Sequence, residues 1–413
     1  MLSRRQMITG AVGVAAGSVA AGCTSGAGAH PSAKWGDPGS SLAPGGTPST
    51  SPVTVAFTPA ADATNVSPAD KVVISATGGT IKSCTVTAGG NTVAGSLDTD
   101  QRTWRSTGDL AYGQTYTVTA SVADPSGATS DKTCTFSTVK PGSTTSVAFQ
   151  ANSMQSLKTG GTYGIGQVVI VHFSRPVTDK AAAQKAVVVD ASPSVDGKFF
   201  WLDKQTLHYR PEKYWAAGTK ISVKVNLLGV NLGGGVWGSG NASTNYNIGD
   251  SRIAVVDTRT HRMLVYINGQ QVHDFPISAG KGGTTKGSNG ETIDFFTRSG
   301  PHVVLEKAQT VEMTSASYGI TNPKDPNYYK EDISLCLRIT YSGEYTHAAG
   351  WNIPDHGQRN VSHGCVNMNP DHAQWLFSTF TLGDVVDVKN TPVQLPVWDG
   401  IGDWNVAWSQ YGG

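Results

Sequence analysis

Two stretches near the C-terminal end of the chain carry residue types that together can perform acyl transfer. His347 opens His-Ala-Ala-Gly-Trp, and Cys365 stands within Ser-His-Gly-Cys-Val-Asn a short distance downstream. The segment between them is rich in Gly, Pro, Asn and Asp, so it can bend and bring the two side chains together. A thiol is a strong nucleophile only as thiolate, and an imidazole is the usual group that removes its proton. The pairing predicts a cysteine nucleophile served by a histidine base.

The full motif resembles the active-site signature of the L,D-transpeptidases, whose catalytic domain is of the YkuD type. It runs His347-x14-Ser-His-Gly-Cys-x-Asn367, and the resemblance extends upstream to Met313 and downstream to Val388. It is closest to the mycobacterial, actinobacterial lipoprotein type with two N-terminal Ig-like domains. The resemblance implies a peptidoglycan enzyme that joins donor and acceptor tetrapeptide stems by 3→3 cross-links through a cysteine thioester. It also implies acylation by carbapenem β-lactams and no cofactor.

The resemblance assigns roles to individual residues. Cys365 is the nucleophile and His347 the base, while the backbone N–H groups of Gly364 and Cys365 are the expected oxyanion donors. His363 either holds the loop or assists with charge. The residues expected to contact substrate or to support the site are Met313, Tyr318, Tyr329, Trp351 and Asn367.

Two positions depart from the family pattern. Relatives often carry Ser directly after the histidine, whereas this chain has Ala348. The backbone carbonyl at that position remains available to orient the imidazole, but any contribution from a hydroxyl is lost. The segment 318–329 resembles the active-site lid of the family, with a tyrosine at each end. One extra residue separates Met313 from the second of these tyrosines, so Tyr328 could take the place of Tyr329.

Three other interpretations remain open. An L,D-carboxypeptidase would use the same thioester and resolve it with water. A catalytically inert wall-binding lipoprotein would keep the fold without the reaction. A metal site is a further alternative, because histidines cluster around Cys365, but structural zinc sites carry compact ligand pairs at both ends and only His363 and Cys365 are that close. No metal is predicted.

The N-terminal residues predict export. Residues 1–22 read as a lipoprotein signal peptide, in which Arg4-Arg5 precede an apolar run that ends Val-Ala-Ala-Gly before Cys23. Cys23 would then be lipidated and anchor the protein at the outer face of the cytoplasmic membrane, in the periplasm and cell wall. Arg4-Arg5 leave open whether export uses the general or the twin-arginine route. The apolar run is short of the roughly 20 residues needed to span a bilayer.

Composition favours a mainly β protein of several domains. The 413 residues include 49 Gly, and the formal net charge of +1 gives no reason to expect nucleic acid as a partner. A Gly/Ser/Pro/Thr linker is expected at 23–52, Ig-like sandwiches at 53–142 and 143–249, and the catalytic domain at 250–390. The Trp-rich tail, 391–413, is expected to pack on the catalytic domain. The Ig-like domains could act as spacers or bind wall polymer.

Two cysteines of the first domain, Cys84 and Cys134, both lie in strand-like runs. In an oxidising compartment they are candidates for a disulfide, although the sequence does not fix their geometry. Cys336 lies in an apolar strand and is expected to be a packed core residue.

Overall fold

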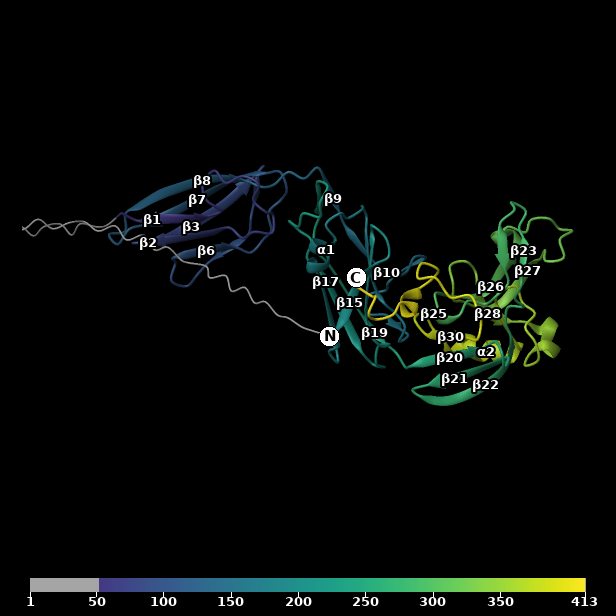
Figure 1. Ribbon diagram of the computed structural model, residues 1–413. Coiled ribbons are helices and arrows are strands. Elements are labelled where there is room, and N and C mark those ends of the chain that lie inside the picture. Colours follow the sequence, from purple (N-terminus) through teal and green to yellow (C-terminus); the bar gives the residue numbers. More distant parts are fainter. Residues whose placement is uncertain (1–51, 413) are drawn as a thin grey trace, which may run out of the picture. The chain divides into compact units, whose positions relative to one another are not determined.

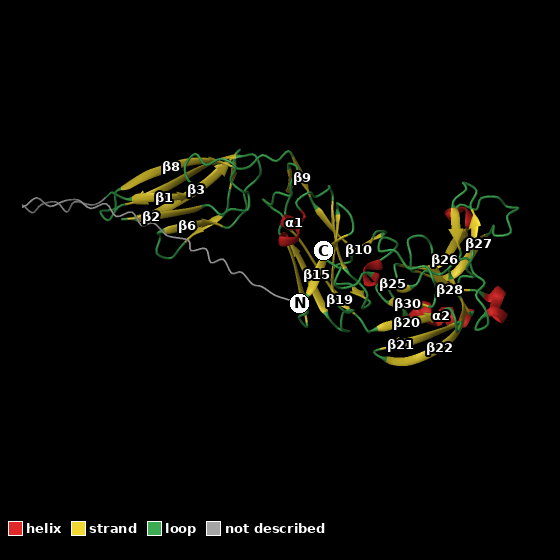
Figure 2. Cartoon of the chain, in the orientation of Figure 1, coloured by secondary structure: helices red, strands yellow, loops and turns green. Residues whose placement is uncertain are grey.

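The computed structural model describes residues 52–412 as a mainly β protein with few helices, which confirms the predicted fold class (Figures 1 and 2). The predicted signal peptide, Cys23 and nearly all of the predicted linker lie outside the described residues. Among the helices described, none is both long and apolar enough to cross a membrane.

The first region contains two four-stranded sheets whose strands alternate buried and exposed residues. Such alternation is expected of sheets that pack face to face over one core. The core includes Trp104, Tyr116 and Phe136. One sheet has the order β1 (Thr54–Thr58), β2 (Val73–Thr77), β6 (Thr103–Ser106) and β5 (Gly95–Leu97), and the other β4 (Asn91–Thr92), β3 (Thr80–Ala88), β7 (Thr115–Ala123) and β8 (Thr129–Ser137).

The candidate disulfide between Cys84 and Cys134 is not formed, and both are free thiols. Cys84 lies on β3 opposite Ala120, and Cys134 lies on β8 opposite Val118, so β7 separates them. Strands two positions apart in a sheet are roughly 9–10 Å from each other, beyond the roughly 7 Å that a disulfide can bridge between Cα atoms. The sequence placed both cysteines on strands correctly but could not give the strand order.

The second region repeats the two-sheet arrangement. Gly113 and Gly218 precede equivalent strands of the two sandwiches and both adopt positive φ, at 65° and 78°. One short helix, α1 (Lys180–Ala186), is capped by Asp179. The sheets have the orders β11 (Gln155–Ser156), β10 (Val147–Asn152), β13 (Val169–Phe173), β16 (Thr206–Pro211), β15 (Gly197–Trp201), then β12 (Thr162–Tyr163), β19 (Ala242–Ile248), β17 (Lys220–Val225), β14 (Val187–Ser192), and the pair β18 (Val236–Gly238), β9 (Ser143–Thr145).

A nine-stranded mixed sheet forms the third region. Its first two strands in chain order, β20 (Arg252–Asp257) and β21 (Arg262–Ile267), pair as an antiparallel hairpin. The sheet order is β25 (Gly300–Val303), β30 (Val385–Lys389), β20 (Arg252–Asp257), β21 (Arg262–Ile267), β22 (Gln270–Ser278), β29 (Val366–Met368), β28 (Tyr345–Ala348), β27 (Lys330–Arg338) and β26 (Glu306–Thr314). A separate hairpin joins β23 (Thr284–Lys286) and β24 (Thr292–Asp294).

Helix α2 (Pro370–Thr379) begins shortly after β29 and helps to fix this strand, which starts directly after Cys365. Asn369 caps it, accepting the Asp371 N–H at 2.9 Å, and Pro370 occupies the first turn, as the sequence predicts. The buried face of α2 presents Ala373 and Leu376 to the same core as Val366 and Met368 of β29.

The C-terminal tail contacts two regions, whereas the prediction named only the catalytic domain. Asn405 donates to the Pro301 carbonyl at 2.8 Å within the catalytic domain. Trp404 donates instead to the Gly166 carbonyl at 2.7 Å, in the second sandwich, and Tyr411 stacks on Phe200 there. Trp398 remains 64% exposed. The sequence identified apolar rings that need partners but not which domain would supply them.

Candidate active site

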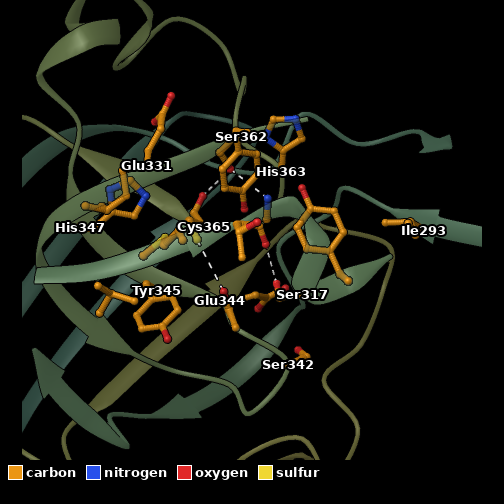
Figure 3. A pocket seen from close by; sticks show the side chains of 18 of the residues that line it. Ile293, Ser317, Glu331, Ser342, Glu344, Tyr345, His347, Ser362, His363 and Cys365 are labelled. Carbon is orange, nitrogen blue, oxygen red and sulfur yellow. Dashed lines mark hydrogen bonds between the residues drawn. The ribbon is translucent and has the colours of Figure 1, made fainter. Parts of the chain in front are cut away.

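Two neighbouring parallel strands place the predicted base and nucleophile on one face of the sheet. In the register of β28 and β29, His347 pairs with Asn367, so Cys365 lies level with Tyr345. Side chains two residues apart on a strand share a face. His347 and Cys365 therefore project from adjacent strands into one pocket (Figure 3). The fold brings together what the sequence keeps apart.

The pocket is a cavity of about 1040 Å³, large enough for a peptide segment. Every residue predicted to act on or contact substrate lines it: Met313, Tyr318, Tyr329, His347, Trp351, His363, Gly364, Cys365 and Asn367. Tyr329 lines the cavity and Tyr328 does not, so the geometry favours the first of the two alternatives.

His347 is a neutral imidazole whose orientation is fixed by a backbone carbonyl. It is 4% exposed, and Nδ1 lies 2.9 Å from the Ala348 carbonyl oxygen. A carbonyl only accepts hydrogen bonds, so Nδ1 carries the proton and Nε2 keeps its lone pair. Burial lowers the pKa of His347 from 6.5 to about 4. The carbonyl orienter expected beside Ala348 is therefore present, and His347 can accept a proton at neutral pH.

Cys365 is a protonated thiol in the resting site. Burial raises the pKa of the Cys365 thiol to about 12, and the nearby Glu344 carboxylate adds to the rise. Sγ donates weakly to the Gly343 carbonyl at 3.8 Å. A neutral thiol thus stands beside a neutral imidazole, and the thiol proton has to leave as the sulfur attacks.

The turn before Cys365 leaves one backbone donor unused. Ser362 Oγ accepts the Gly364 N–H at 3.1 Å and donates to the Cys365 carbonyl at 2.5 Å, while Thr297 Oγ1 donates to the Gly364 carbonyl at 2.7 Å. Within residues 52–412 the Cys365 N–H makes no hydrogen bond. The prediction that Gly364 supplies an oxyanion donor is therefore wrong for this state, because Ser362 already occupies its N–H.

Gly364 is needed for a different reason. Its φ of +144° is a backbone conformation that residues with a side chain rarely adopt. A Cβ there would meet no atom closer than 3.8 Å, so the constraint comes from the backbone and not from crowding. The glycine permits the turn that presents Cys365.

His363 holds the lid side of the pocket. Its ring stacks on Tyr329 at 5.2 Å, and Nε2 lies 3.3 Å from Lys281 Nζ, which itself donates to Asn327 of the lid loop at 2.7 Å. Burial and the Lys281 charge lower the pKa of His363 to about 4. Of the two predicted roles, holding the loop fits this neutral ring and supplying positive charge does not.

The lid begins at β26 and the short helix η1 (Ser315–Tyr318), which ends at Gly319 with a φ of +103°. Tyr318 and Tyr329 flank the loop, with ring centroids 6.1 Å apart. The Tyr318 hydroxyl is buried and lines the pocket near Tyr329. Met313, 8% exposed, packs in a cluster that includes Cys336 and Cys365. Cys336 is a core residue, as predicted.

Trp351 forms the outer edge of the pocket. It lies in the short helix η2 (Gly350–Asp355), is 60% exposed, and stacks over His347 at a centroid distance of 5.9 Å. This placement fits the predicted contact with substrate at the pocket wall.

Sequence reasoning gave no role to three residues that shape the site. Ser362 is part of the motif, but its two backbone contacts depend on the turn. Thr297 comes from a distant segment and carries no local signal. Glu344 is 7% exposed, lines the cavity and accepts the Arg298 N–H at 3.0 Å. Its neighbours in the sequence gave no indication of a buried carboxylate.

Comparison with known proteins agrees with the geometry. The L,D-transpeptidase catalytic domain (YkuD) matches residues 251–388, and a bacterial Ig domain matches residues 63–231. L,D-transpeptidase 2 of Mycobacterium tuberculosis is 35% identical over 323 residues, covering 78% of this chain and 74% of that protein. L,D-transpeptidase 5 of the same species is 30% identical and covers 86% and 75%.

Among solved structures, L,D-transpeptidase 3 from Mycobacterium tuberculosis, in complex with a faropenem-derived adduct, is 29% identical. The match covers 59% of this chain and 98% of the chain in that structure, with a TM-score of 0.46. The extent and identity of the match to L,D-transpeptidase 2, together with the catalytic-domain match over the nine-stranded sheet, place this chain in the L,D-transpeptidase family.

Proposed function

We propose that the protein forms 3→3 cross-links between peptidoglycan stem peptides through a thioester on Cys365. The observation that carries the proposal is the neutral thiol–imidazole pair beside a single unused backbone donor, all facing one peptide-sized cavity. Such a pair gains charge only during the reaction, where the donor can stabilise it.

In the first half-reaction Cys365 Sγ attacks the carbonyl carbon of the third stem residue as His347 Nε2 takes the thiol proton. The tetrahedral oxygen accepts a hydrogen bond from the Cys365 N–H. The bond to the terminal D-alanine then breaks, and its leaving amine takes the proton from the imidazolium. A thioester remains on the cysteine.

In the second half-reaction the side-chain amine of an acceptor stem attacks the thioester carbon. His347 takes a proton from the amine and returns it to sulfur as the carbon–sulfur bond breaks. Both half-reactions use the same three groups, and neither needs a cofactor.

The first test is mass spectrometry of products from a disaccharide-tetrapeptide incubated with the full chain. A cross-linked dimer, lighter by one alanine than two substrates, supports the proposal. Tripeptide alone would indicate an L,D-carboxypeptidase, and unchanged substrate would favour an inert wall-binding protein. Cys365→Ala should abolish product while leaving the melting temperature unchanged.

Carbapenems should acylate Cys365, because the same attack on a strained lactam carbonyl breaks the ring C–N bond, and the ring nitrogen takes the proton and stays attached to the adduct. A solved L,D-transpeptidase in complex with imipenem, a carbapenem, supports this expectation for a relative. One carbapenem per chain, on the peptide that contains Cys365, is the expected mass increase.

Export and lipidation at Cys23 belong to the same proposal, since peptidoglycan lies outside the cytoplasm. The protein should fractionate with membranes in its host. Cys23→Ala should release it, and a variant that stays with the membrane would contradict the lipid anchor.

A further inference from the structure

The peptide bond between Gly364 and Cys365 is held from outside its own loop by one hydroxyl. Thr297 Oγ1 donates to the Gly364 carbonyl oxygen at 2.7 Å. The same Oγ1 accepts the Gly280 N–H at 2.9 Å. Because its lone pairs serve Gly280, its single proton is directed to Gly364.

Thr297 itself is rigidly placed. It is 1% exposed, and its own backbone carbonyl accepts a hydrogen bond from Thr391 Oγ1 at 2.7 Å. Gly280 approaches so closely that a Cβ there would stand 2.6 Å from the Thr297 nitrogen. These contacts come from three separate segments of the chain and leave the hydroxyl little freedom.

In a trans peptide the C=O and N–H bonds point in opposite directions. The Gly364 carbonyl points towards buried Thr297, which does not line the cavity, whereas Gly364 and Cys365 both do. The Cys365 N–H is therefore turned away from Thr297, and it is the one polar backbone group of residues 364 and 365 with no partner in the described chain.

We infer that Thr297 is a positioning residue for acyl transfer, whose hydroxyl holds the Gly364–Cys365 peptide so that the Cys365 N–H faces the developing oxyanion. The inference rests on the proposed function. Thr297 touches neither substrate nor sulfur and acts through the peptide plane. Without the hydroxyl, the plane can rotate and the donor loses its direction.

Two reactions of the same thiol separate this role from a general structural one. Acylation by a carbapenem passes through a tetrahedral oxyanion and needs the donor. Alkylation by iodoacetamide occurs at a saturated carbon, expels iodide and forms no oxyanion. Both are followed on the full chain by mass spectrometry of the peptide that contains Cys365.

Thr297→Val, which replaces the hydroxyl by a methyl group of similar size, should slow acylation at least tenfold and leave alkylation within threefold of wild type. Thr297→Ser restores the hydroxyl and should acylate within threefold of wild type. Thr258→Val is the matched control, because Thr258 also donates from a buried site to backbone carbonyls, those of Lys389 and Asn390. It should change neither rate.

The inference is overturned if Thr297→Val acylates within threefold of wild type, or if alkylation falls in parallel with acylation. It is also overturned if Thr297→Ser does not recover acylation. Should Thr297→Val fail to fold by circular dichroism, Thr297→Ala removes the same hydroxyl and is judged by the same ratio. If the wild-type chain is alkylated but never acylated, the proposed function has failed, and the variants are not the reason.

Discussion

Two buried histidines in this protein have opposite uses, and the difference lies in their partners. His347 is 4% exposed and His208 is 2% exposed. The Nδ1 of His347 lies 2.9 Å from a backbone carbonyl, whereas the Nδ1 of His208 lies 2.9 Å from the Asp403 carboxylate. A carbonyl fixes the tautomer without adding charge, while a carboxylate brings a negative charge next to the ring. The first environment suits a catalytic base, and the second suits a structural contact.

The contact between His208 and Asp403 lies where the C-terminal tail meets the second sandwich. Burial would raise the pKa of Asp403, yet the charge and hydrogen bond of His208 and the hydrogen bond from Tyr411, at 2.7 Å, hold it below its usual range. Arg210 stands 4.2 Å from the centre of the Tyr411 ring and adds a positive charge. His208 does not line the cavity that contains His347 and Cys365. Burial alone therefore does not identify a functional histidine.

Replacing His347 or His208 by Leu should give the largest difference between the two sites in the rate of carbapenem acylation. His347→Leu removes the proposed base for Cys365, and general-base catalysis contributes about 10²- to 10⁴-fold. Carbapenem acylation should fall by roughly that factor, with little change in melting temperature. Acylation within fivefold of wild type would mean that another group takes the thiol proton. His208→Leu is the control and should acylate normally.

The free energy of unfolding should show the opposite order, with the larger loss for His208→Leu. His208→Leu leaves the Asp403 carboxylate buried without its imidazole partner, and breaking a buried pair costs about 3–5 kcal/mol. Urea unfolding should show a loss of that order, whereas His347→Leu should show little. Equal losses in the free energy of unfolding at both sites would contradict the distinction between a catalytic base and a structural histidine.

Acid should sharpen the comparison further. The folded pKa of His347 is about 4 against an ordinary 6.5, so between these values the unfolded chain binds more protons. Stability is therefore lost as pH falls from about 6.5 to about 4, by at most about 3 kcal/mol from this residue. Urea unfolding at pH 4.5 and 7 should show a smaller pH difference in His347→Leu than in wild type. His363 has a lowered pKa too, but it is the same in both proteins and cancels.

The sequence predicted the catalytic residues better than it predicted the residues that hold them in position. The residue types of His347 and Cys365, the segment between them that can bend, and the resemblance to the L,D-transpeptidases sufficed to predict the pair, but not the parallel strands that align it. The positive-φ turn at Gly364 could also be anticipated from glycine itself. Thr297 could not, because its contact with Gly364 crosses 67 positions of the chain and depends on the strand order.

The same limit explains what the sequence left open or incomplete. Strand propensity placed Cys84 and Cys134 on strands, but only the sheet order shows that β7 lies between them. The tail contacts the catalytic domain as expected, but the second sandwich also supplies Arg210 and His208 as partners. Local patterns give the type of an element, and long-range pairing decides what it meets.

The smallest expected effect tests whether the carbonyl alone orients His347. Ala348→Ser restores the hydroxyl that relatives often carry, at a position that is 8% exposed. Because Nδ1 already donates to the Ala348 carbonyl, the added hydroxyl should change carbapenem acylation by less than about threefold. Ala348→Gly keeps the same carbonyl with no side chain and serves as the matched control. A tenfold faster Ala348→Ser variant would show that the carbonyl orients the imidazole incompletely, and that the contrast with the His208 carboxylate is one of degree.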